Sequence, residues 1–102
     1  MKTIHVICHQ LASGEFEFTR HALGRAAERN IAEQEICQIA ENAKMIEDYP
    51  EDKYSPSCLV FGYTKRKRPL HLQVSYADTE LLRIITLYEP DPKEWIEFTN
   101  RR

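Results

Sequence analysis

The sequence lacks the features of several protein classes. No apolar run is long enough for a membrane span or a signal-peptide core, because His5, His9 and Gln10 interrupt the apolar residues near the start. There are three cysteines, an odd number without a C-x-x-C pair, which fits neither a disulfide framework nor a zinc ribbon. We therefore expect a soluble protein of the reducing cytoplasm that does not contact the membrane.

The sequence also lacks an excess of positive charge. Fourteen Lys and Arg residues stand against sixteen Asp and Glu residues, for a formal net charge of -2. The whole molecule therefore has no field that attracts nucleic acid, and any such contact must be local. The chain contains no repeat, low-complexity stretch or second domain, and its 102 residues fit a single domain, 1–102.

Helical patterns fill the first half of the chain. Apolar residues at helical spacing predict a first helix over Thr3–Ser13, and Gly14 follows as a stop. Thr19 suits the N-cap of a second helix that runs to about Arg29, since its hydroxyl can accept a backbone N–H of the first turn. A third helix is predicted over Ala32–Asn42. Between the first two helices, Glu15–Phe18 is a short strand or an extended linker.

Strand patterns fill the second half. Four segments are short, joined by turn-like residues and mostly rich in β-formers: Lys44–Tyr49, Cys58–Tyr63, Leu70–Tyr76 and Leu81–Glu89. We expect an α+β fold in which the N-terminal helices pack on an antiparallel sheet of about four strands, paired in sequence order. After Pro90 ends the last strand, Trp95, Ile96 and Phe98 are apolar enough to fold back onto the domain.

Alternation along the strands sorts their side chains into two faces. In the third predicted strand His71, Gln73 and Ser75 share the face opposite to the leucines. This polar face is either the solvated side of the sheet or the floor of a cleft. In the last strand one parity holds Leu82, Ile84, Thr86 and Tyr88 and the other holds Arg83, Ile85 and Leu87, and the pattern leaves open which one faces out.

The second helix is predicted to carry a cationic edge. Winding at 100° per residue places Leu23, Ala26 and Ala27 on the core side and His21, Arg25 and Glu28 on the opposite side, while Arg29 extends the row. This edge is either an ordinary solvated surface or a phosphate site, because a titratable imidazole beside fixed positive charge suits phosphate chemistry.

Two further patterns have simple alternatives. The run Lys65, Arg66, Lys67 and Arg68 is either a solvated hairpin tip or a grip for a phosphate backbone. His5, Cys8 and His9 form H-x-x-C-H, in which two histidines one turn apart can hold a metal. Because Cys8 belongs to the apolar stripe and no further ligand pair is evident, we expect no metal and no cofactor.

Several segments together resemble a known bacterial family, the domain of unknown function 4258. The similarity lies in Arg20–Leu23 with Glu28–Asn30, and in four later segments in the same order, which are Glu47–Pro50, Ser57–Gly62, Arg68–Val74 and Ile84–Pro92. In fold this family resembles small ribonuclease toxins of the RelE and BrnT kind, so a RelE- or barnase-like arrangement is implied. The resemblance implies a metal-independent activity with His21, Arg25, Arg29, His71, Thr86 and Tyr88 as the polar cluster.

The leading hypothesis is therefore an endoribonuclease, the toxin of a bacterial toxin–antitoxin pair. His21 and His71 would act as acid and base in either order, Arg25 and Arg29 would stabilise the phosphorane, and Tyr88 would position the substrate or donate a proton. Lys65–Arg68 would follow the RNA backbone. The resemblance also implies a small antitoxin partner of the zinc-finger or helix-turn-helix type.

Two rival hypotheses remain. A non-catalytic module would bind a partner protein through a sheet edge or the cationic helix face, and it predicts that His21 and His71 lie far apart. A metal-binding regulator would use His5 and His9 and would carry a stoichiometric ion.

Overall fold

Two of the three helices begin at a threonine cap. The computed structural model describes all 102 residues and contains α1 (Ile4–Ser13), α2 (Arg20–Glu28) and α3 (Glu33–Ile39). Thr3 and Thr19 are the N-caps of α1 and α2, and each hydroxyl accepts a backbone N–H of the first turn. Gly14, with a φ of 78°, ends α1 in the left-handed conformation that glycine adopts without strain. The third helix ends at Ile39, three residues before the predicted end.

The sheet has five strands, so the prediction of about four was wrong. The four predicted strands are present as β2 (Lys44–Tyr49), β3 (Ser57–Tyr63), β4 (Pro69–Ser75) and β5 (Leu82–Tyr88), paired antiparallel in sequence order. The fifth is β1 (Phe16–Phe18), which pairs in parallel with β5 and completes the order β1-β5-β4-β3-β2. Three residues are too few for an alternating pattern to separate a strand from an extended linker.

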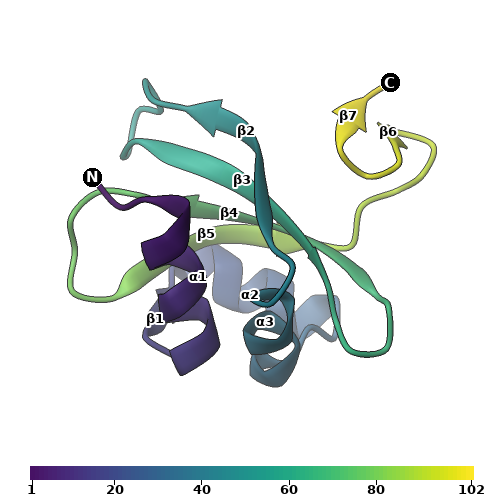
Figure 1. The fold of residues 1–102 in the computed structure, drawn as a ribbon, viewed down its shortest axis with the longest axis horizontal. Helices are drawn as coiled ribbons and strands as arrows, with labels where there is room; N and C mark the ends of the chain where they lie inside the picture. The colour runs from purple at the N-terminus through teal and green to yellow at the C-terminus, as the bar shows by residue number, and fades with distance from the viewer.

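The helices cover one face of this sheet (Figure 1). Core side chains come from all three helices and from strands β3, β4 and β5. The fully buried members with the largest side chains are Ile7, Leu11, Ile36, Ile39, Leu70, Leu72, Leu82, Ile84 and Leu87. None of the helices is both long and apolar enough to span a membrane.

A β-bulge in β5 decides which residues face the core. Gln73 pairs with Thr86 and Val74 pairs with Ile84, so Ile85 has no partner on β4. An unpaired residue reverses the alternation of side chains beyond it. Leu87 therefore joins Ile84 on the helix side, although strict alternation puts them on opposite faces. Thr86 and Tyr88 pair with Gln73 and His71 and share their face.

The C-terminal residues 91–102, here called the C-terminal hook, cover part of the other face of the sheet. The hook contains the short strands β6 (Trp95–Ile96) and β7 (Asn100–Arg101), which pair antiparallel. It lies across the sheet from the helices in Figure 1. Trp95 is only 3% exposed, which confirms that this segment folds back onto the domain.

Candidate functional site

Helix α2 lies along the edge of β5 that β1 leaves free. Strand β1 pairs with β5 only as far as Ile84. Beyond Ile84, side chains at the two ends of α2 donate hydrogen bonds to backbone carbonyl groups of β5. The Thr19 hydroxyl donates to the Ile85 carbonyl at 3.1 Å, and Arg29 Nη1 donates to the Leu87 carbonyl at 2.7 Å. Helix and strand edge are thus fixed to each other at both ends.

The packing of α2 differs from the predicted one. Ala22 and Ala26 are the buried residues, whereas Leu23 is 60% exposed and Ala27 is exposed as well. The prediction of a core position was therefore right for Ala26 and wrong for Leu23 and Ala27, because the buried stripe lies about one position further round the helix. Two small alanine side chains allow the helix to approach the sheet closely.

The predicted cationic row consequently lies beside the buried stripe. His21, Arg25 and Arg29 follow each other at intervals of one turn along one flank of α2. Arg25 forms an ion pair with Glu28 at 3.0 Å, and its side chain is 39% exposed. Arg29 forms no ion pair, so its guanidinium charge is not neutralised by a neighbouring carboxylate.

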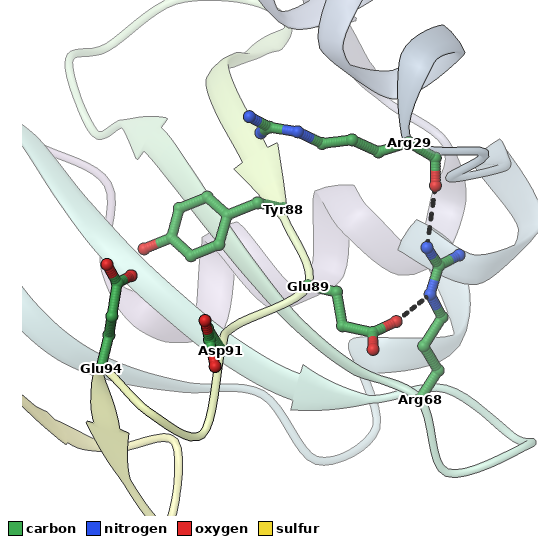
Figure 2. Close-up of a pocket in the computed structure, with 6 residues that line it drawn as sticks. All are labelled: Arg29, Arg68, Tyr88, Glu89, Asp91 and Glu94. Carbon is green, nitrogen blue, oxygen red and sulfur yellow. Dashed lines mark hydrogen bonds and ion pairs between the residues drawn. The ribbon is translucent and has the colours of Figure 1, made fainter.

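A cavity of about 550 Å³ opens at the C-terminal end of α2. Figure 2 shows Arg29 and Tyr88 on its upper side, with Asp91 and Glu94 of the C-terminal hook below them. Its lining residues are Arg29, Arg68, Tyr88, Glu89, Asp91 and Glu94. The cavity, here called the Arg29 cavity, therefore combines two guanidinium groups with three carboxylates.

His71 lies behind Tyr88, completely buried beneath the C-terminal hook. Its Nε2 atom is 2.7 Å from the Phe98 carbonyl and its Nδ1 atom is 3.1 Å from the Tyr88 hydroxyl. The Trp95 ring packs edge-on against the imidazole, with centroids 4.5 Å apart. Burial lowers the pKa of His71, so the neutral imidazole is favoured.

The carbonyl partner fixes the tautomer of this neutral imidazole. A carbonyl oxygen only accepts, so Nε2 carries the hydrogen that it donates to Phe98. Nδ1 is then an acceptor, and the Tyr88 hydroxyl donates to it. The Tyr88 oxygen keeps its lone pairs for a ligand in the Arg29 cavity. Burial raises the pKa of this hydroxyl above its ordinary value.

Arg101 holds the C-terminal hook on the sheet. Its guanidinium forms two hydrogen bonds to the Glu47 carboxylate, at 2.9 and 3.1 Å, and lies over the Trp95 ring at 4.6 Å from the centroid. The Tyr49 hydroxyl also donates to Glu47. Burial alone would raise the pKa of Glu47, but the bonds from Arg101 and Tyr49 keep it below its ordinary value.

A second cavity of about 530 Å³ opens near the N-terminal end of α2. It is lined by Thr19, His21, Tyr54, Ser55, Ser75, Arg83 and Ile85, and is called the Tyr54 cavity below. His21 is the only residue of the predicted polar cluster in it.

The structure thus brings together only part of the predicted cluster. Arg29 and Tyr88 line one cavity with His71 directly behind it, whereas His21 lines the other. Arg25 and Thr86 line neither. The two histidines therefore do not share a space, because His71 is enclosed by the hook rather than open to a cleft.

The predicted basic run Lys65–Arg68 is also split: its first three residues are free of ion pairs, and its last residue is not. Lys65, Arg66 and Lys67 are exposed in the β3–β4 hairpin and form no ion pair. Arg68 instead bonds to Glu35 and Glu89 and to the carbonyls of Arg29 and Asn30. Its charge is already neutralised within the protein, so only the first three residues are free to hold a phosphate.

Sequence reasoning missed Tyr54 and Arg83, which line the Tyr54 cavity. A signal for Tyr54 was present, since it is an aromatic residue in an otherwise polar, proline-bounded loop. Nothing in the sequence singled out Arg83. No group of three His, Cys, Asp or Glu side chains is arranged to hold a metal ion.

Comparison with known families places most of this architecture in one of them. Residues 18–89, more than half of the chain, match the family described as Domain of unknown function (DUF4258). The chain belongs to this family. The DUF4258 match includes α2, β2 to β5 and Tyr88, and it ends before the C-terminal hook. No curated protein and no solved structure matches the chain.

Proposed function

We propose that the protein is a metal-independent endoribonuclease of RelE-like fold, the toxin of a bacterial toxin–antitoxin pair, and that the Arg29 cavity is its site of cleavage. The observation that carries this proposal is the pairing of Arg29 with Tyr88 in one cavity. An unneutralised guanidinium binds a phosphate and stabilises the charge that develops on it during attack.

The Tyr88–His71 pair supports the role of the base. Attack by a ribose 2′-hydroxyl on phosphorus requires a group that takes its proton. The Tyr88 oxygen accepts that proton while its own proton passes to His71 Nδ1, 3.1 Å away. The 5′-oxygen of the cleaved bond leaves and takes a proton from water. His71 thus acts through Tyr88 and does not touch the RNA.

The neighbouring cations suit the flanking nucleotides. His21 lies two turns before Arg29 on α2, a rise of about 12 Å. It is therefore placed for a neighbouring nucleotide rather than for the cleaved phosphate. Arg25 lies between them, and Lys65, Arg66 and Lys67 give the backbone a further cationic contact.

A toxin of this kind needs a neutralising partner. The exposed apolar residues Leu23 and Ala27 lie on the flank of α2 away from the cationic row. They suit contact with a small antitoxin of the zinc-finger or helix-turn-helix type, which would then lie close to both cavities.

A second candidate is the non-catalytic interaction module. Two observations favour it: His21 and His71 lie apart, and three carboxylates line the Arg29 cavity together with its two arginines. Acidic groups repel a phosphate backbone and suit a protein partner instead.

Expression in bacteria separates the two candidates. The ribonuclease proposal predicts that the wild-type protein arrests growth and fragments cellular RNA, and that Arg29→Ala abolishes both effects. Arg20→Ala is the matched control, since Arg20 is exposed on the same helix, forms no ion pair and lines no cavity. Unimpaired growth and intact RNA with the wild-type protein would refute the ribonuclease proposal and leave the interaction module as the remaining candidate.

A further inference from the structure

Tyr54 lines the Tyr54 cavity, and its aromatic side chain is not packed into the core. Tyr54 is 91% exposed, the highest value among the large hydrophobic residues of the chain. Its hydroxyl makes no hydrogen bond within the protein. Burying the ring against another flat surface would remove apolar area from water, so this side chain is available for a ligand.

The loop that carries Tyr54 is nevertheless well anchored. Asp52 accepts hydrogen bonds from the Tyr54 backbone N–H at 3.1 Å, the Ser57 hydroxyl at 3.0 Å and the Gln73 amide at 3.0 Å. Ser55 and Ser75 also share a hydrogen bond of 2.5 Å between their hydroxyls. The aromatic ring is therefore presented from a loop that is tied to β3 and β4.

Other lining residues of the Tyr54 cavity supply polar and charged groups. His21 comes from the first turn of α2, and Arg83 comes from β5. Glu17 accepts two hydrogen bonds from Arg83, at 3.1 and 3.3 Å, which orients its guanidinium. The lining of this cavity of about 530 Å³ thus includes an aromatic ring, a guanidinium group, an imidazole and two serine residues.

We propose that the Tyr54 cavity binds one nucleobase of a single-stranded RNA, stacked on the Tyr54 ring, next to the nucleotide held in the Arg29 cavity. This inference rests on the proposed function, since it names a substrate subsite for it. Single-stranded RNA is recognised by aromatic side chains that stack on unpaired bases and by polar groups that contact the base edges. The two cavities lie at opposite ends of a helix of nine residues, a length that one or two nucleotides can follow.

Binding to a non-cleavable ligand tests the subsite without requiring cleavage. A fluorescently labelled single-stranded hexanucleotide with 2′-deoxyribose at every position cannot undergo attack by a 2′-hydroxyl. Tyr54→Ala is expected to weaken its binding about 5- to 150-fold, the range that the loss of one base stack produces. Tyr54→Phe keeps the ring and is expected to bind as the wild-type protein does.

A change in the ligand provides the complementary test. Hexanucleotides with one abasic position, moved along the strand, are expected to lose affinity at one position more than at the others. At that position Tyr54→Ala is expected to cause no further loss, because base and ring are partners in the same contact. Since Tyr54 is exposed, the variant is expected to keep the thermal unfolding midpoint of the wild-type protein.

The outcomes distinguish the subsite from the catalytic proposal. Wild-type protein that binds the hexanucleotide through Tyr54 but leaves the matching RNA intact would refute cleavage and keep the subsite. Equal affinities of the wild-type protein and Tyr54→Ala would refute the subsite, whether or not RNA is cleaved. Absence of any hexanucleotide binding would also overturn it and would leave a protein partner as the ligand of this surface.

Discussion

The Tyr88 hydroxyl donates its hydrogen to Nδ1 of His71 across 3.1 Å, on the face of the sheet opposite to the helices. The direction of this bond follows from the second bond of the imidazole. His71 Nε2 donates its hydrogen to the Phe98 carbonyl, so Nδ1 carries none and accepts. The buried imidazole of His71 is thereby connected, through Tyr88, to the Arg29 cavity.

Tyr88→Phe removes the hydroxyl and keeps the ring. We expect cleavage of RNA to fall by about two orders of magnitude or more, because the attacking hydroxyl loses its proton acceptor. His71 Nδ1 also loses its partner, which should cost about 1–3 kcal/mol of stability. Initial cleavage rates and urea unfolding measure the two effects. Unchanged cleavage by a destabilised variant would remove Tyr88 from the reaction and keep its structural role.

His71 gives the folding stability a specific dependence on pH. Because burial lowers its pKa in the folded state, the unfolded chain binds the proton more readily. The contribution of His71 to the free energy of unfolding is therefore fully present above its unfolded pKa of about 6.5. This contribution decreases as the pH falls from there towards the folded pKa. Glu47, whose pKa is also lowered, adds its own loss only at more acidic pH.

Denaturant unfolding at pH 7.5 and pH 5.5 measures this difference. His71→Gln cannot titrate and is expected to show a smaller loss of stability at pH 5.5 than the wild-type protein shows. His5→Gln is the matched control, since His5 is exposed on α1, and it should keep the wild-type loss. A loss that persists unchanged in His71→Gln would assign the pH dependence to another group.

Arg68 should matter for stability, unlike its neighbour Lys65. It ties the corner between α2 and α3 to the β3–β4 hairpin through two carboxylates and two backbone carbonyls. Arg68→Ala leaves these acceptors without their donor, and we expect a loss of about 2 kcal/mol or more. Lys65→Ala should change stability by less than about 0.5 kcal/mol. Equal thermal midpoints for the two variants would contradict this assignment.

Two glycines should respond to alanine in opposite directions. A Cβ atom at Gly62 would lie 2.7 Å from Ile39 Cβ and 2.9 Å from the Ile39 carbonyl oxygen, so α3 must move away from β3. We expect Gly62→Ala to destabilise by about 1–3 kcal/mol. At Gly24, in the exposed flank of α2, a Cβ meets nothing within 4 Å, and Gly24→Ala should stabilise by about 0.4–1 kcal/mol. Calorimetric unfolding compares both variants with the wild type.

Local sequence signals predicted most of the fold. Apolar residues at helical spacing located α1, the Thr19 cap located the start of α2, and the alternation of Leu70 to Ser75 located β4. The bulge at Ile85 and the parallel partner β1 were not predictable in this way. The parallel pairing joins segments more than sixty residues apart, and the bulge is a property of the register between β4 and β5, so no local periodicity encodes either.

The candidate site was predictable only where it lies on one element. The spacing of His21, Arg25 and Arg29 along α2 follows from helical geometry alone. The burial of His71 does not, since the polar face of β4 would be open to solvent without the C-terminal hook. Hook residues contribute the Phe98 carbonyl and Trp95, whose contacts with β4 are purely tertiary. His21 and His71 were predicted to open into one cleft. The structure instead brings Arg29 and Tyr88 together in one cavity.

The central claim is tested most directly by identifying the ends of the RNA fragments that the purified protein produces. Single-stranded RNA is incubated with the wild-type protein and a metal chelator, beside Arg29→Gln and the same oligonucleotide with 2′-deoxyribose. We predict fragments that end in a 2′,3′-cyclic phosphate, about two orders of magnitude less product with Arg29→Gln, and no cleavage of the deoxy strand. RNA that stays intact with the wild-type protein, or fragments that Arg29→Gln forms equally fast, would contradict cleavage in the Arg29 cavity.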